Sequence, residues 1–345
     1  MNLTHLEKLE DVQYCFEFVN TSCPRVTRPT AINAALYIFI TISILITIFG
    51  NLVVIISVLH FKQLQTPTNC LILSLAVVDF LVGFIVLPYS MVRSVETCWY
   101  FGEVFCKIHS IIDIVLTIVS IYTLCFIAID RYYAMCDPLL HSIKITLPII
   151  IVTMILIWLF ALFYGLSVFL LDFSKKSVDD YMATRSCDGS CIAYDKFEGH
   201  VDALIVFFIP IFIILGVYVK IFFVMRCKHG GRIGNMSHNS HCTEENNIKI
   251  LHKKEQIVVK NQDILIGIFT LSWLPFYVNS ILNPYFNFLI PPAIDSVFAW
   301  FGFFNSTLNP LLYAFLYPWF RKTLKLILSG QIFNSDSSTI NFLSE

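Results

Sequence analysis

The chain has 345 residues, of which 57% are hydrophobic and only 14% are charged. Soluble domains carry about 25% charged residues, so this composition excludes an ordinary soluble enzyme. The formal net charge is -1, and no clustered basic excess marks a nucleic-acid partner. The mean hydropathy of +0.74 indicates a protein in contact with membrane lipid.

Seven mostly apolar runs recur along the chain, each long enough to cross a bilayer as a helix, which takes about 20 residues. They cover residues 33–60, 68–92, 104–135, 145–171, 201–225, 262–288 and 293–317. A membrane barrel would need alternating segments of about ten residues, whereas these runs are continuous. The sequence therefore predicts an all-α fold, a seven-transmembrane-helix bundle.

The chain is predicted to have three parts: an extracellular N-terminal tail at 1–32, the bundle at 33–318, and a cytoplasmic amphipathic helix and tail at 319–345. This orientation places the larger share of Lys and Arg on the cytoplasmic side. It also exposes the sequons at Asn2 and Asn20 to glycosylation. The amphipathic segment after residue 318 is too short to span, so we expect it on the inner membrane surface.

Ionisable side chains inside the spans cost at least a few kcal/mol each, so each is a candidate functional residue. They are Asp79, Asp113, Asp130, Arg131 and Asp202. Asp113 and Asp130 lie about 25 Å apart on one helix, which assigns the first to an outer cavity and the second to the cytoplasmic rim.

Asp202 lies eight residues before Pro210, about 12 Å toward the outside of the fifth span. We expect it to face Asp113 across the outer cavity, where two carboxylates repel each other. A ligand with a cation at each end would relieve that repulsion. The alternative is that Asp202 points toward His200 or the lipid interface.

Arg131 stands beside Asp130, which can neutralise it locally. Glu255, at the start of the sixth span, is a candidate bidentate partner for Arg131 in a resting state. The alternative is that Arg131 only anchors a helix end among the lipid headgroups.

An ordered set of motifs across the spans resembles the landmarks of rhodopsin-like G-protein-coupled receptors. The set comprises Gly50-Asn51, Leu75-Ala76-Val77-Val78-Asp79, Asp130-Arg131-Tyr132, Trp158, Pro210, Phe269 with Trp273-Leu274-Pro275-Phe276, and Asn309-Pro310-Leu311-Leu312-Tyr313. Residues 305–320 further resemble the fingerprint of the trace amine-associated receptors. The resemblance covers roughly residues 20 to 330.

The resemblance implies an amine pocket in which Asp113 pairs with a ligand ammonium. An acid at the position of Asp202 resembles the diamine-recognising members, whose ligands are compounds such as cadaverine or putrescine. Phe303 stands where most members carry a tyrosine that supports the ligand-pairing acid. The aromatic residues expected in the pocket are Trp273, Phe276, Tyr277, Trp300 and Phe303.

The resemblance also implies an activation switch, a buried sodium cluster and two disulfides. The switch comprises Asp130, Arg131, Tyr132, Glu255, Asn309, Pro310 and Tyr313; the sodium cluster comprises Asp79, Asn51 and Asn309; and the bridges are Cys106–Cys191 and Cys23–Cys187. Apart from an allosteric sodium ion, no cofactor is expected. Cys15 and Cys98 either pair with each other or stay free.

The implied function is that of a multi-pass plasma-membrane receptor, not an enzyme, that senses extracellular amines. Its expected partners are an amine or diamine, a heterotrimeric G protein of the stimulatory class that raises cyclic AMP, and membrane lipid, and its expected host is an olfactory neuron. A histamine or monoamine receptor is the first alternative. A seven-helix cation or proton transporter is more distant, because the two halves show no self-similarity.

Overall fold

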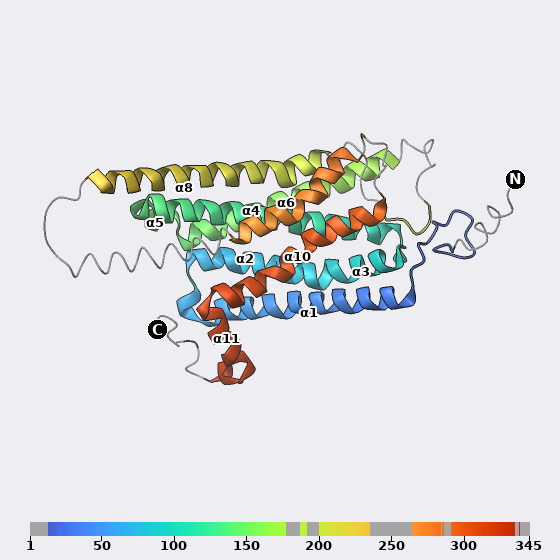
Figure 1. The fold of residues 1–345 in the computed structure, drawn as a ribbon, viewed down its shortest axis with the longest axis horizontal. Helices are drawn as coiled ribbons and strands as arrows, with labels where there is room; N and C mark the ends of the chain where they lie inside the picture. Colours follow the sequence, from blue (N-terminus) through green and yellow to red (C-terminus); the bar gives the residue numbers. More distant parts are fainter. Residues whose placement is uncertain are drawn as a thin grey trace.

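The computed structural model describes residues 13–176, 187–191, 200–234, 264–283, 285, 291–334 and 338. The long helical spans of these residues lie side by side, as Figure 1 shows. Their residue ranges give seven such spans. The predicted all-α, seven-helix bundle is confirmed.

The spans begin and end close to the predicted positions. They are α1 (Thr30–His60), α2 (Pro67–Leu81) continued by η3 (Val82–Val86) and α3 (Leu87–Glu96), α4 (Glu103–Cys136), α6 (Leu147–Lys176), η4 (Ala203–Phe208) with α8 (Ile209–Gly234), the sixth span Ile264–Leu282, and α10 (Pro292–Leu316). Shorter helices are η2 (Lys62–Leu64), α5 (Pro138–Lys144), α11 (Pro318–Leu328) and η5 (Gln331–Phe333).

The sixth span is shorter than predicted. Its helix ends at Leu282, and Asn283 lies in a turn, whereas the apolar run predicted a helix to residue 288. Residue 284 is a proline, which disfavours helical geometry in the residue before it. The helix therefore ends two residues before this proline.

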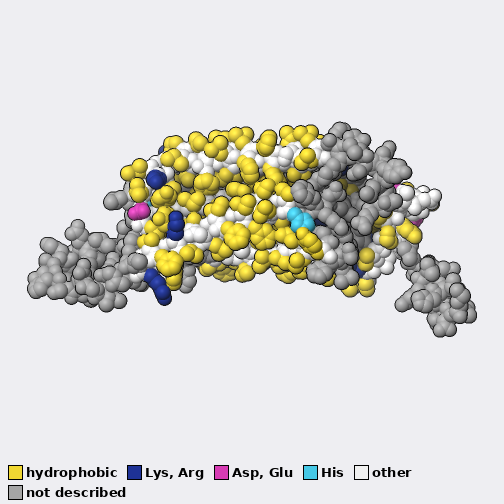
Figure 2. All heavy atoms as spheres, turned by 90° about the horizontal axis from the view of Figure 1, so that it is seen from above, with side chains coloured by type: hydrophobic (Ala, Val, Ile, Leu, Met, Phe, Trp, Pro, Cys, Tyr) yellow, Lys and Arg dark blue, Asp and Glu magenta, His cyan; other side chains and the backbone are white. Residues whose placement is uncertain are grey.

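The bundle has an apolar exterior and one central helix. Among the described residues, six helices are long and apolar enough to cross a membrane, and 72% of the apolar stretch of α4 is buried against 22% for α6. Figure 2 shows a nearly continuous hydrophobic belt on one face, with Lys and Arg side chains gathered toward one end. The seventh long helix, α10, contains four polar residues that turn inward and are buried: Asn305, Ser306, Thr307 and Asn309.

Two spans contain a π-helical segment just before a proline. η3 precedes Pro88, and η4 precedes Pro210. Proline lacks the N–H that would bond the carbonyl four residues earlier, and that carbonyl falls inside the π-helical segment in both spans. The widened turns of η3 and η4 both contact α4, in the half of the bundle where Asp113 and Asp202 also lie.

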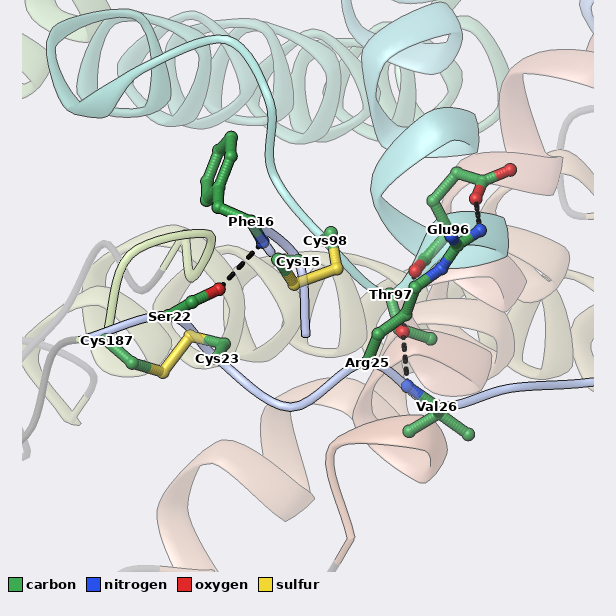
Figure 3. Close-up of a disulfide and its surroundings, with 10 residues drawn as sticks. All are labelled: Cys15, Phe16, Ser22, Cys23, Arg25, Val26, Glu96, Thr97, Cys98 and Cys187. Carbon is green, nitrogen blue, oxygen red and sulfur yellow. Dashed lines mark hydrogen bonds and ion pairs between the residues drawn. A yellow bond between two sulfur atoms is a disulfide. The ribbon is translucent and has the colours of Figure 1, made fainter. Parts of the chain in front are cut away.

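Three disulfides staple one end of the bundle, which we call the disulfide end. The structure joins Cys106 to Cys191 and Cys23 to Cys187, the two pairs that the resemblance implied, and it also joins Cys15 to Cys98. Figure 3 shows two of these bridges, Cys15–Cys98 and Cys23–Cys187, with the N-terminal segment lying beside the end of α3. Here the Arg25 guanidinium pairs with the Glu96 carboxylate, and the Val26 N–H donates to the Thr97 hydroxyl at 3.0 Å.

The opposite end carries α11, which turns away from the bundle axis beside the end of α1 (Figure 1). Phe320 and Thr323 face the bundle and are buried, whereas Leu328 is exposed. Ile332 of η5 packs against Phe61 and Leu64 in the turn after α1. The predicted amphipathic helix is therefore present from Pro318 to Leu328.

Candidate functional site

Asp113 lies on the central helix α4, near the disulfide end. Its carboxylate makes no hydrogen bond or ion pair with any described residue, and it lines a cavity of about 20 Å³ between the spans. A water molecule needs roughly 10–15 Å³ of such space, so the cavity suits a very small group. Its lining comprises Val78, Asp79, Val82, Asp113, Leu116, Thr117, Ser120, Phe269, Trp273, Gly302, Phe303, Asn305 and Ser306.

Asp202 begins the π-helical segment of the fifth span and is half-buried. The Tyr164 hydroxyl on α6 donates to its carboxylate at 3.3 Å, whereas the neighbouring His200 ring packs edge-on against Tyr285. Gly165, the residue after Tyr164 on α6, packs against Ile111 and Val115 of α4, which flank Asp113 in the chain. Both carboxylates therefore belong to one region between α4, α6 and the fifth span.

Tyr277 of the sixth span contacts both the fifth span, through Phe207, and the aromatic residue Trp273. Its ring stacks on Phe207 with the ring centres 4.7 Å apart, and it is almost fully buried. Tyr277 thus closes the side of the region that faces the sixth span.

The other aromatic residues expected in the pocket form one connected cluster. Trp273 contacts Phe276, Tyr277 and Phe303 with ring centres 5.7, 5.8 and 5.9 Å apart, and Phe303 contacts Trp300 at 5.6 Å. Gly302 permits this packing, because a Cβ there would lie 2.6 Å from the Trp273 ring. Phe303 offers no hydroxyl, so its position gives Asp113 an aromatic neighbour rather than a hydrogen-bond donor.

Arg93 is a charged residue of this region that the sequence pattern did not reveal. It lies on α3 and is half-buried, between Ser90, whose hydroxyl lies 3.5 Å from the His109 ring on α4, and Ser94, whose hydroxyl accepts a hydrogen bond from Trp300. The residue lies close to the end of an apolar span, where a basic side chain is ordinarily a headgroup anchor. A second charged residue that the sequence pattern did not reveal is Asp295 on α10, whose carboxylate accepts a hydrogen bond from Asn279.

Asp79 is the centre of a buried polar cluster. Its carboxylate accepts hydrogen bonds from the Ser306 hydroxyl at 2.7 Å and the Asn309 amide at 2.6 Å. Asn51 joins the cluster indirectly by donating to the Ser306 carbonyl at 3.0 Å, and its own side-chain oxygen has no hydrogen-bond partner. Ser120 lines the adjoining cavity from α4.

The expected switch residues lie at the opposite end. Asp130 is fully buried and accepts hydrogen bonds from Arg131, from Thr68 at 3.0 Å, and from the His141 ring at 2.9 Å. Arg131 also donates to Thr68 at 3.0 Å. The anchoring alternative for Arg131 is therefore wrong for this arrangement, because the guanidinium is only 6% exposed and pairs with Asp130. Glu255, its other expected partner, lies outside the described residues.

His141 was not predicted as a site residue, because it lies in α5, outside the spans in which ionisable side chains indicate function. Tyr132 packs against Tyr133 with ring centres 5.4 Å apart. Pro310 lies inside α10 directly against Gly50, where a Cβ would approach its ring within 2.5 Å.

Tyr313 of α10 is completely buried, yet its hydroxyl has no hydrogen-bond partner. Its ring contacts Tyr317 at 5.8 Å, and the Tyr317 hydroxyl is likewise unpartnered. Leaving a buried polar group without a partner costs about 1–3 kcal/mol. An arrangement that supplied a partner to either hydroxyl would recover part of that free energy.

Of the two expected glycosylation sites, Asn20 is exposed in the segment between Cys15 and Cys23, and Asn2 lies outside the described residues.

Comparison with known protein sequences shows which family the chain resembles. Residues 50–313 match the family described as 7 transmembrane receptor (rhodopsin family). The chain is 43% identical over 330 residues to trace amine-associated receptor 4 of Mus musculus, covering 95% of each chain. It is 42% identical to trace amine-associated receptor 13c of Danio rerio, covering 98% of each chain, and 41% identical to trace amine-associated receptor 1 of Homo sapiens, covering 96% of this chain and 98% of that one.

Proposed function

Since the chain belongs to the trace amine-associated receptors of the rhodopsin family, we propose that it senses extracellular diamines such as cadaverine or putrescine and signals through a stimulatory G protein to cyclic AMP in an olfactory neuron. As a member of this family it is a G-protein-coupled receptor of the plasma membrane and not an enzyme. Membership also removes the transporter alternative. The observation that carries the diamine proposal is the pair of carboxylates, Asp113 and Asp202, both of which lie where α6 packs at Tyr164 and Gly165.

The disulfide end faces the outside in this proposal. Disulfides persist in oxidising compartments, and Lys and Arg are enriched at cytoplasmic ends of membrane helices. The three bridges at one end and the basic side chains toward the other (Figure 2) support this orientation. The exposed sequon at Asn20 lies at the same end as the bridges.

The diamine binds with one ammonium at Asp113 and the other at Asp202. Asp113 has no partner of its own among the described residues, so an ammonium supplies the counter-charge that a half-buried carboxylate lacks. Asp202 keeps its hydrogen bond from Tyr164 and has a free oxygen for the second ammonium. Tyr277 and Trp300 present aromatic faces, which attract cations by about 0.5–2 kcal/mol each.

Binding favours the active state only by the difference in ligand affinity between the two states. A ligand bridging Asp113 and Asp202 draws α4 and the fifth span together, and Trp273 lies beneath it in contact with Phe303. At the cytoplasmic end Arg131 then leaves Asp130 and meets the G protein. The unpartnered hydroxyl of Tyr313 would gain a partner in that rearrangement, which contributes to its free energy.

A sodium ion fits beside Asp79 in the resting state. The carboxylate is 2% exposed, receives two hydrogen bonds, and has no cationic partner in the described part of the chain. The orphaned oxygen of Asn51 and the cavity reaching Ser120 supply oxygen donors nearby. The ion would supply the positive charge that Asp79 lacks. Asp79→Asn is expected to remove any dependence of agonist affinity on sodium concentration.

The test is a cyclic AMP reporter in transfected cells exposed to cadaverine, putrescine, histamine and pentylamine. The proposal expects the two diamines to act at lower concentrations than pentylamine, because pentylamine leaves Asp202 unpaired. Asp113→Asn should lose the response to all of them while reaching the cell surface. Equal potency of pentylamine and cadaverine would make the protein a single-anchor monoamine receptor, and selective action of histamine would make it a histamine receptor.

A further inference from the structure

The last turn of α3 is held by the N-terminal segment that precedes α1. In an α-helix the last four carbonyls have no partner within the helix, and in α3 these belong to residues 93–96. The Arg28 guanidinium donates to two of them, the Ser94 carbonyl at 3.1 Å and the Val95 carbonyl at 3.2 Å. A cation is also favoured at this end, because the helix dipole places partial negative charge there. Arg28 therefore caps α3 from a position 66 residues earlier in the chain.

The residue that follows α3 adds to the need for this support. Thr97 has the left-handed conformation, with φ 57°, which usually favours glycine. The Val26 N–H donates to the Thr97 hydroxyl at 3.0 Å, and the Arg25 guanidinium pairs with the Glu96 carboxylate (Figure 3). Residues 25–28 therefore hold the last turn of α3 in place.

Ser94 connects this support to the aromatic residues of the candidate site. Its carbonyl accepts a hydrogen bond from Arg28, and its hydroxyl accepts one from the Trp300 indole on α10 at 3.0 Å. Trp300 packs edge-on against Phe303 with ring centres 5.6 Å apart, and Phe303 lines the cavity at Asp113. A continuous series of contacts therefore joins the N-terminal segment to the cavity.

The orientation of the Trp300 ring depends on the hydrogen bond to Ser94. Trp300 is only 9% exposed, and a buried tryptophan N–H usually finds an acceptor. The indole has one N–H and accepts no hydrogen bond, so the position of this acceptor fixes the plane of the ring. An aromatic ring attracts a cation across its face. The end of α3 therefore decides how Trp300 presents that face to an ammonium group.

We propose that Arg28 is a positioning residue of the amine site, which acts through Ser94 on the ring of Trp300 and thereby sets the potency of amines. This inference rests on the proposed function, which gives Trp300 a cation contact. Arg28 does not touch the ligand; it holds the turn of α3 that supplies the acceptor for the indole. The alternative is that Arg28 only anchors the chain among the lipid headgroups, in which case its loss would leave the potency of amines unchanged.

The experiment measures cyclic AMP responses to cadaverine and pentylamine in the full-length receptor at matched surface expression. Arg28→Met keeps a long, flexible side chain without donors. It should weaken both amines about 2- to 30-fold, which is the range for the loss of one cation–π contact. Arg28→Lys keeps the charge and the donors and should retain wild-type potency. Arg25→Met removes the same charge from the same segment but leaves the Ser94 carbonyl with Arg28, so this matched control should change neither potency.

A double-mutant cycle separates positioning from a general effect on folding. If Arg28 acts through Trp300, Arg28→Met should have no further effect on potency once Trp300→Phe has removed the indole N–H. The melting temperature of the ligand-free receptor in detergent provides the same cycle without an agonist. There, too, the double variant should lose less than the sum of the two single losses.

Three results would overturn the inference. They are wild-type potency in Arg28→Met, equal losses of potency in Arg28→Met and Arg25→Met, and additive effects of Arg28→Met and Trp300→Phe. Equal potency of cadaverine and pentylamine in the wild type would instead defeat the diamine function, and the comparison of Arg28 variants would then support or overturn its positioning role with either amine. In a receptor silent to both amines, additive losses in the melting-temperature cycle would overturn the inference, and non-additive losses would support it.

Discussion

The Cys15–Cys98 bridge should contribute substantially to stability even though two other bridges hold the same end. Its cysteines are 83 residues apart along the chain, which alone would correspond to about 4.6 kcal/mol of lost unfolded-state entropy. The other two bridges shorten the path between these cysteines. The chain runs from Cys15 to Cys23, the Cys23–Cys187 bridge leads on to Cys191, and the Cys191–Cys106 bridge leads back to Cys98. The ring that the third bridge closes has about 20 residues, which corresponds to about 3 kcal/mol.

Replacing Cys15 and Cys98 together with serine removes the bridge without leaving an unpaired thiol. We expect the melting temperature of the ligand-free receptor in detergent to fall by roughly 5–10 °C. The measurement is the fraction that stays monomeric by size-exclusion chromatography after heating. Cys70→Ala, which alters a cysteine outside the bridges, is the control. An unchanged melting temperature, or free thiols at Cys15 and Cys98 in the wild-type protein, would refute the reasoning.

Two further substitutions test the packing of the pocket and the contacts of the switch. Gly302→Ala places a methyl group 2.6 Å from the Trp273 ring and should cost about 1–3 kcal/mol of stability, measured by the same heating assay, whereas Gly216→Ala, with open space around it, should cost nothing comparable. His141→Ala removes a hydrogen bond to the buried Asp130 worth about 1.5–3 kcal/mol, so ligand-independent cyclic AMP should rise about tenfold. A tyrosine at position 141 keeps a donor and should restore low basal signalling; unchanged basal signalling in the alanine variant would contradict this role.

The bundle was predictable from sequence because each span must satisfy its backbone hydrogen bonds internally and therefore forms a long apolar helix. Local exceptions were harder to predict, because the sixth helix ends at Leu282 although its apolar run continues past Pro284, and a proline indicates a kink but not a π-helical segment. Asp113 and Asp202 were predictable as candidate functional residues, because a carboxylate inside a membrane span costs free energy and therefore indicates a function.

Other parts of the site depend on contacts that spacing does not reveal. Arg93 resembles a headgroup anchor until the Ser90 and Ser94 contacts place its helix against α4 and α10. The partner of Cys15 could not be deduced, because several pairings satisfy the same cysteine count. Asn51 was expected in one cluster with Asp79, and the structure connects the two through Ser306, whose carbonyl accepts from Asn51 and whose hydroxyl donates to Asp79. The pairing of Arg131 with Glu255 stays a prediction.

The most direct measurement of the central claim is the ratio of cadaverine to pentylamine potency in Asp202→Asn. The substitution keeps the size of the side chain and removes the charge for the second ammonium, so cadaverine should weaken about 10- to 100-fold while pentylamine stays the same. Glu103→Gln removes an exposed acid from the same end of α4 and should leave the ratio unchanged. If Asp202→Asn shifts both amines equally, or neither, the receptor does not hold a diamine between two carboxylates.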